Sequence, residues 1–252
     1  ASVISQYVSA ILVVWHMMRL NDACKFYFQR LRFHGDEVGR ILGLGVPAGI
    51  QHMIFAIANL FIQAAVNSFD STMVSGNAAA ANTDTIIYNI MMAFYTACST
   101  FMGQNWGAGH KKRMMDSYLI SLFYAFAIAA VLGVAFYFAG RPFLYVFTNS
   151  ADVVEAGMQR MKIMCFSYAI SAFMDNTIAA CRGLGRTIVP TVVVIMGSCV
   201  FRVIWVYTIF AYFHTIPSLY LLYAFSWTIT AAAEIVYFLH CFRKLRLVPE
   251  TA

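Results

Sequence analysis

Charged residues are scarce in this 252-residue chain: only 11% are Asp, Glu, Lys or Arg, whereas 61% are hydrophobic and the mean hydropathy is +0.70. Soluble domains contain about 25% charged and about 45–50% apolar residues, so the composition excludes a water-soluble globule. Aromatic residues make up 16% of the chain, which excludes a disordered or collagen-like protein. We therefore expect an all-α membrane protein whose helices cross the bilayer.

The sequence also lacks the motifs of enzymes and metal sites. Its six cysteines form no C-x-x-C pair, so neither a zinc site nor a disulfide framework is predicted. No H-E-x-x-H, P-loop or Gly-x-Ser-x-Gly pattern occurs, so we expect neither an enzyme nor a bound cofactor. The last apolar stretch contains no lysine, which excludes a retinal Schiff base there.

Seven apolar stretches are predicted to cross the membrane as helices, since each approaches or exceeds the roughly 20 residues that a bilayer requires. Their approximate bounds are Ser2–Met18, Ile41–Phe69, Thr85–Gly103, Tyr118–Gly140, Val153–Ala180, Ile188–Phe213 and Leu219–Cys241. The chain starts inside an apolar stretch, has no signal peptide and has an odd number of spans. For these reasons we expect it to be a fragment of a longer protein.

The basic residues predict the orientation of these spans. Of the 17 Lys and Arg residues, 13 lie in the connections after the first, third and fifth spans and in the C-terminal tail. The opposite connections, Asp70–Asp84, Arg141–Asp152 and His214–Ser218, contain only Arg141. Because positive loops stay on the cytoplasmic side, we expect a cytoplasmic C-terminus in a multi-pass protein of the plasma membrane. The aromatic and basic stretch 25–40 is interpreted either as a short helix on the inner leaflet or as a solvated linker.

Ionisable residues inside spans are the first functional candidates, because they are expensive to bury in a bilayer. Asp175 is a candidate for ion coupling or for binding a cationic substrate, and the alternative is an internal ion pair or a structural hydrogen bond. For Arg202 a structural role is favoured. Glu234 follows a run of small residues, so we expect it to face protein rather than lipid. Arg160 and Lys162 are expected to reach the outer membrane surface.

The second span carries polar amides on one side. Pro47 predicts a bend near its start. Gln51, Asn59, Gln63 and Asn67 recur at helical spacing, which places them along one stripe. Such a stripe indicates either the wall of a polar cavity or a seam between helices.

Four motifs carry a family resemblance. The sequence Gly103-Gln104-Asn105-Trp106-Gly107-Ala108-Gly109 resembles the G-Q-N-x-G-A-G signature in the C-terminal half of MATE (multidrug and toxic compound extrusion) transporters. The stretch Gly43–Gly49 with Pro47 resembles the family's Gly-x-Pro opening of the first C-lobe helix. The stretch Cys181–Gly185 is similar to its R-G-x-G turn, and Arg202 matches an Arg common in the eleventh helix.

The resemblance implies the last helix of an N-lobe followed by the six-helix C-lobe of a twelve-helix transporter. Residues 1–18 would be the last helix of a truncated N-lobe, 19–40 a cytoplasmic linker, 41–242 the C-lobe and 243–252 a cytoplasmic tail. The family implies an efflux antiporter that expels amphipathic, often cationic compounds in exchange for H⁺ or Na⁺, by alternating access of two lobes. Small-molecule substrate, membrane lipid and the absent N-terminal lobe would then be its partners, with no nucleic acid.

On this interpretation, Asp175, Gln51, Asn59 and Asn67 would contact ion or substrate, with Arg202 and Glu234 as structural or coupling residues. A separate group would act at a cytoplasmic gate or hinge: Gly103, Gln104, Gly107, Gly109 and Pro47. Sodium-coupled members carry acidic residues where this chain has Phe55 and Ser171, so the coupling carboxylate belongs either to Asp175 or to the absent lobe. The alternatives are a flippase of lipid-linked precursors or polysaccharides and a complete seven-helix receptor.

Overall fold

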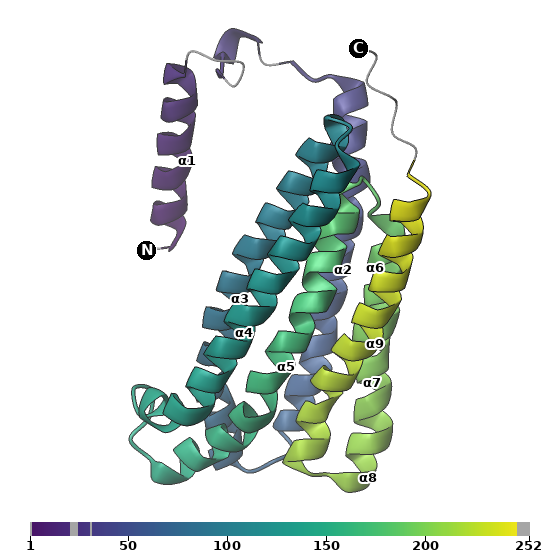
Figure 1. The fold of residues 1–252 in the computed structure, drawn as a ribbon. Coiled ribbons are helices and arrows are strands. Elements are labelled where there is room, and N and C mark those ends of the chain that lie inside the picture. Colours follow the sequence, from purple (N-terminus) through teal and green to yellow (C-terminus); the bar gives the residue numbers. More distant parts are fainter. Residues whose placement is uncertain (1, 21–24, 31, 246–252) are drawn as a thin grey trace. The chain divides into compact units, whose positions relative to one another are not determined.

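A computed structural model describes residues 2–20, 25–30 and 32–245 (Figure 1). Residue 1, residues 21–24 and 31 of the predicted linker, and residues 246–252 of the predicted tail lie outside the described residues. The chain divides into two compact units, Ala1–Leu42 and Gly43–Ala252. The first unit contains α1 (Ser2–Arg19), the short 3-10 helix η1 (Phe28–Arg30) and the start of α2 (Gly35–Val66).

The second unit is a bundle of long helices. It contains the rest of α2, then α3 (Ser71–Gly107), α4 (Lys111–Leu144) and α5 (Ala151–Gly183). A fifth membrane-length element is divided into α6 (Ile188–Val194), π-helical η2 (Ile195–Val200), α7 (Phe201–Trp205), π-helical η3 (Val206–Phe210) and α8 (Ala211–Phe213). The last helix is α9 (Ile216–Arg243). The all-α fold expected from the sequence is thereby confirmed.

Six helices of the described residues are long and apolar enough to cross a membrane, and these are the elements from α2 onward. The first predicted span, Ser2–Met18, is helical but is not among those six. The large side chains exposed on the second unit include Phe138, Tyr207 and Tyr212. In a membrane protein such side chains face lipid rather than water.

One predicted connection is wrong. Residues from Ser71 to Asp84 are not a loop, because α3 begins at Ser71. Asp70 caps this helix by accepting a hydrogen bond from the backbone N–H of Met73 at 3.0 Å, which satisfies one of the free donors of the first turn. The following residues include the buried Gly76, Ala79 and Ala80, small side chains that allow close packing against α5.

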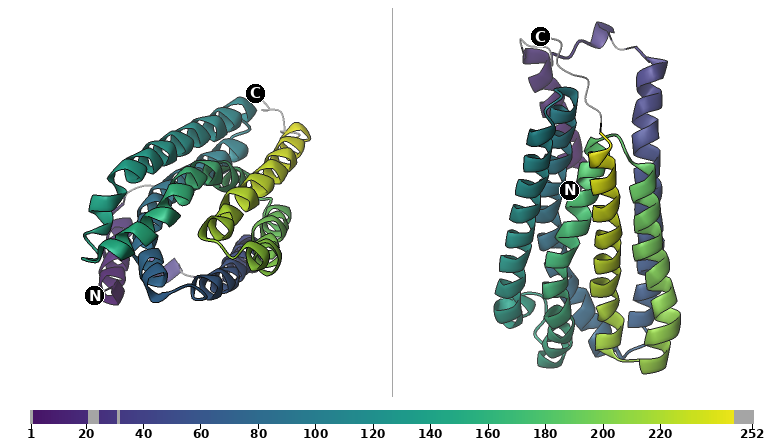
Figure 2. Two further views of the ribbon diagram at one scale, coloured as in Figure 1. Left: turned by 90° about the horizontal axis from the view of Figure 1, so that it is seen from below. Right: turned by 45° about the vertical axis from the view of Figure 1, so that its right-hand side comes forward.

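The most buried helix of the bundle is α5. In its most apolar 18-residue stretch, 72% of the residues are buried, compared with 11% for α2. It packs against α3, α4 and α9, as Figure 2 shows from below and from the side. The residues that α5 presents are therefore held in place from several directions.

Two glycines terminate helices at the same end of the bundle. Gly109 follows the end of α3 with φ +75°, and Gly185 follows the end of α5 with φ +71°. In each turn the glycine and the next residue donate backbone hydrogen bonds to carbonyls of the last helical turn, as from Gly109 to Trp106 and from Gly185 to Arg182. Glycine adopts this left-handed conformation without the penalty of a Cβ, so both motif turns end their helices sharply.

Candidate functional site

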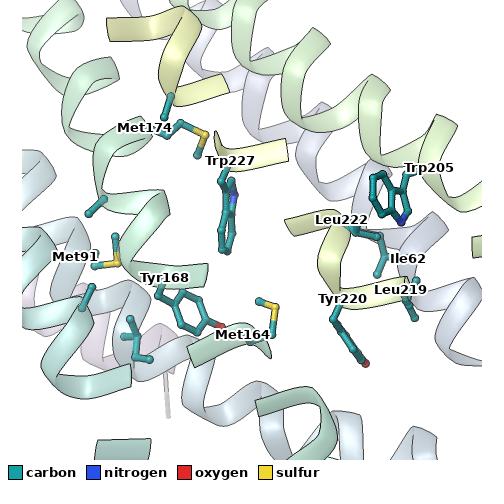
Figure 3. Close-up of a cluster of buried hydrophobic side chains, with 14 of the residues drawn as sticks. Ile62, Met91, Met164, Tyr168, Met174, Trp205, Leu219, Tyr220, Leu222 and Trp227 are labelled. Atoms are coloured by element: carbon teal, nitrogen blue, oxygen red, sulfur yellow. The ribbon is translucent and has the colours of Figure 1, made fainter. Parts of the chain in front are cut away.

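A cavity of about 540 Å³ lies inside the second unit. Its walls come from α2, α3, α5, α7 and α9, which surround a common centre when viewed along the bundle (Figure 2, left). Much of the wall is aromatic or sulfur-containing, and Figure 3 shows Met91, Met164, Met174, Tyr168 and Trp227 from this group. Methionine is flexible and polarisable, so this wall suits apolar and aromatic molecules of varied shape.

Asp175 lines this cavity from α5. Within the described residues its carboxylate makes no hydrogen bond and no ion pair. Tyr88 and Tyr95 of α3 line the same cavity. An ionisable carboxylate in a membrane protein that has no fixed partner can take up a proton or bind a cation.

Arg182 connects three helices at the edge of the cavity. Its guanidinium donates to Gln51 Oε1 of α2 at 2.9 Å and to the hydroxyl of Tyr95 of α3 at 2.5 Å. Arg182 itself belongs to α5. Because α2 is otherwise lightly buried, the bond from Arg182 holds the part of α2 around Gln51 beside the cavity.

Arg202 is enclosed by aromatic rings on the other side of the cavity. Its guanidinium carbon lies 4.5 Å from the ring centre of Tyr223, 5.5 Å from that of Phe55 and 5.6 Å from that of Trp227. Cations are attracted to the faces of such rings. The residue is only 2% exposed, and its Nε donates to Ser226 Oγ at 3.2 Å.

A buried ion pair links α3 to α5. Arg160, with 7% of its side chain exposed, pairs with Asp84, which also lines the cavity. The sequence-based expectation that Arg160 reaches the membrane surface is therefore wrong. Asp84 neutralises the charge of Arg160 inside the bundle, because α3 continues through the segment that was predicted to be a loop.

The MatE family profile matches residues 47–208, which is more than half of the chain. The chain belongs to the MATE family. Membership confirms the family resemblance that the sequence indicated, and the family is one of multi-pass membrane transporters rather than enzymes.

Curated relatives and solved structures agree with this assignment. The chain is 32% identical over 133 residues to "Probable multidrug resistance protein YpnP" of Bacillus subtilis, covering 53% of the chain and 30% of that protein. It is 24% identical over 145 residues to "FAD transporter" of Shewanella oneidensis, covering 58% of the chain and 31% of that protein.

The fold itself is that of a solved MATE transporter. An outward-facing multidrug resistance MATE family structure superposes with a TM-score of 0.85 at 16% identity. The superposition covers 95% of this chain but 54% of that one. The chain therefore spans about half the length of the MATE structure, and no more than about a third of each of these two curated relatives is matched.

The cavity of this MATE-family chain brings together some of the predicted site residues. Gln51, Asn59, Asp175 and Arg202 all line it. Asn67 does not, because α2 ends at Val66 and the Asn67 side chain accepts a hydrogen bond from Gln63 at 2.9 Å. The predicted amide stripe therefore has two parts, one facing the cavity and one exposed.

Glu234 and the glycine motif lie apart from the cavity lining. Glu234 is fully buried, and within the described residues both of its carboxylate oxygens lack a hydrogen-bond partner. Gly103, Gln104 and Gly107 belong to the last turns of α3, and Gly109 follows them. Pro47 lies inside α2, one turn before Gln51.

Sequence reasoning missed the role of two residues that the structure brings to the site. Arg182 was assigned to a cytoplasmic turn, although it forms the bond to Gln51. Asp84 was assigned to an outer connection, although it pairs with Arg160. The helix-capping pattern at Asp70 was the available signal for Asp84, since it predicts a helix start directly after that residue. Within the described ranges, no cluster of three or more His, Cys, Asp or Glu side chains is arranged to hold a metal ion.

Proposed function

We propose that this chain forms the C-lobe of an efflux antiporter that exports amphipathic, cationic compounds in exchange for H⁺ or Na⁺. The observation that carries the proposal is the position of Asp175. Its carboxylate faces a cavity of about 540 Å³ and has no hydrogen bond or ion pair among the described residues. Family membership supports transport, and the aromatic and methionine wall supports an amphipathic substrate.

The proposed mechanism is competition at one carboxylate. When Asp175 is ionised, it attracts the cationic group of the substrate while the rings hold the apolar part. When a proton or Na⁺ arrives, that attraction is lost and the substrate leaves. A gradient of H⁺ or Na⁺ can then drive export, provided that the cavity opens alternately to the two sides.

We further propose that a second bundle of similar size completes the cavity. The solved MATE structure is about twice as long as this chain, which supports a two-lobe arrangement with residues 1–18 as the last N-lobe helix, 19–40 as a linker, 41–242 as the C-lobe and 243–252 as a tail. The basic connections support a plasma-membrane protein with a cytoplasmic C-terminus. Gly103, Gln104, Gly107, Gly109 and Pro47 would then act at the cytoplasmic gate or hinge.

A flippase of lipid-linked precursors is less favoured by the cavity. Such a substrate carries a pyrophosphate group and calls for several available basic residues. Arg160 is engaged by Asp84, and Arg182 is engaged by Gln51 and Tyr95. Among the described arginines that line the cavity, one buried nitrogen of Arg202 (Nη2) and one of Arg182 (Nε) lack a hydrogen-bond partner, which is little for a pyrophosphate.

The test is transport by the full-length protein that carries this chain, reconstituted in vesicles with the fluorescent cation dansylcadaverine. Asp175→Asn is expected to abolish the dependence of transport on the H⁺ or Na⁺ gradient, because the substituted amide cannot ionise. Asp175→Glu should keep that dependence. Asp152→Asn removes an exposed carboxylate at the start of the same helix and is the matched control. Gradient-dependent transport by Asp175→Asn at the wild-type rate would refute the proposal.

A further inference from the structure

The guanidinium of Arg202 is an incompletely satisfied charge inside the bundle. Its Nε has a partner in Ser226, but its Nη2 is buried and has no hydrogen-bond partner among the described residues. Within the same residues no carboxylate lies close enough to form an ion pair with it. Buried charges are normally paired, because an unpaired one loses its hydration without compensation. Packing against rings offsets only part of that loss.

Among the described residues, no other charged group of the cavity forms an ion pair with Arg202. Asp84 is held by Arg160. Arg182 is held by the neutral side chains of Gln51 and Tyr95. Asp175 is the remaining carboxylate of the lining, and among the described residues it interacts electrostatically with both Arg202 and Arg182 without forming an ion pair with either, so one carboxylate faces two arginines.

The chemistry of Arg202 favours one class of ligand. A guanidinium is a planar set of donors that matches a carboxylate or phosphate, and it stays protonated. Tyr223 and Trp227 beside it offer ring faces to an aromatic group. The cavity therefore presents an anion-binding group, an apolar wall and, at Asp175, a cation-binding group.

We propose that Arg202 forms an anion subsite, and that the cavity is suited to aromatic zwitterions whose anionic group binds Arg202 while the cationic group meets Asp175. The inference rests on the proposed function, since it requires that this cavity is where the substrate binds. It adds a specific expectation that the cationic-substrate proposal alone does not contain. A carboxylate added to a cationic aromatic compound should strengthen binding rather than weaken it.

Two dansyl compounds isolate the effect of that carboxylate. Nε-dansyl-lysine is a zwitterion, and dansylcadaverine is the same molecule without the carboxylate. Binding of each to the full-length protein in detergent is measured by the rise in dansyl fluorescence. The wild-type protein is expected to prefer dansyl-lysine, and Arg202→Gln should reduce that preference by about 10-fold to 100-fold, the range for hydrogen bonds to charged groups. Arg202→Lys should keep part of the preference, because it keeps the charge but loses the planar donors.

Arg141→Gln is the matched control. Arg141 is an exposed arginine that pairs with Glu155 and does not line the cavity, so its substitution should leave both affinities unchanged. Blocking the carboxylate gives a second measurement that needs no variant. The methyl ester of dansyl-lysine should bind the wild-type protein more weakly than dansyl-lysine does.

The outcomes separate this inference from the proposed function. Equal binding of dansyl-lysine and its ester by the wild-type protein, or an unchanged preference in Arg202→Gln, would overturn the anion subsite. The effect of Asp175→Asn on dansylcadaverine transport would still decide the proposed function. Conversely, a lost preference in Arg202→Gln together with normal gradient dependence in Asp175→Asn would support the subsite and reject the antiport proposal.

Discussion

Two motif glycines face each other across the α3–α5 seam, and they should respond differently to the same substitution. A Cβ on Gly183 would lie 2.5 Å from Met102 Cβ and 2.7 Å from Ser99 O. A Cβ on Gly103 would meet only Gly183 O, at 3.5 Å. The two contacts of a Cβ at Gly183 are with a Cβ atom and a backbone oxygen of α3, so no rotamer change relieves them.

The magnitude follows from this geometry. To accept alanine at 183, α3 and α5 must separate by about 1 Å in a seam packed as densely as a crystal. Overpacking of this kind costs about 1–3 kcal/mol. Gly103→Ala has no such cost and gains up to about 1 kcal/mol of helix propensity. The two variants should thus differ by about 1–4 kcal/mol.

Thermal unfolding of the detergent-solubilised protein measures the difference. At about 2–4 °C per kcal/mol for a chain of this size, Gly183→Ala should unfold several degrees below the wild type. Gly103→Ala should unfold at or above the wild-type temperature. If Gly183→Ala proved as stable as Gly103→Ala, the close approach of α3 and α5 at this end of the bundle would be wrong.

Three further substitutions test individual contacts by the same unfolding measurement. Arg160→Gln leaves Asp84 without its buried partner and should destabilise the protein by about 3 kcal/mol. Replacing both residues with apolar ones should restore most of this loss. No recovery in the double variant would contradict the pairing. Thr215→Ala removes the cap of α9, which accepts from the Ser218 N–H at 3.3 Å, and should cost about 1 kcal/mol; a neutral effect would show that the cap contributes nothing. Trp205→Phe removes the indole N–H that donates to Ser218 O at 2.7 Å and should cost about 1–3 kcal/mol. An unchanged stability would show instead that water replaces the indole N–H.

The helices from Ile41 onward were predictable because each carries a long apolar run. The error at Asp70–Asp84 has a physical cause. That segment contains Asn77, Asn82 and Asp84 among small residues, a composition typical of loops. It is helical because α3 packs its small side chains against α5 and places Asp84 opposite Arg160. The hydropathy of a short segment does not predict such tertiary contacts, because the partner residues lie far away in the sequence.

The candidate site was predictable to a similar degree. Asp175, Gln51 and Asn59 could be predicted because a polar group inside an apolar span is expensive to bury whatever its neighbours are. The rings around Arg202 could not be predicted, since Phe55, Tyr223 and Trp227 come from α2 and α9 and meet Arg202 only through packing.

Near Pro47, α2 has few contacts that hold it in place, since Gln51 is the only buried residue before Ala58 among the described residues of this helix. In the most apolar 18-residue stretch of α2, 11% of the residues are buried, whereas the buried share is at least 22% in each of the other elements that line the cavity. Gln51, one turn after Pro47, is bonded to Arg182, which is fixed by the central helix α5. A bend at Pro47 would therefore strain or release this bond first. Arg182 also bonds Tyr95 of α3. We therefore propose that releasing Gln51 would change the cavity wall while leaving the α3–α5 seam in place, as a gate at Pro47 requires.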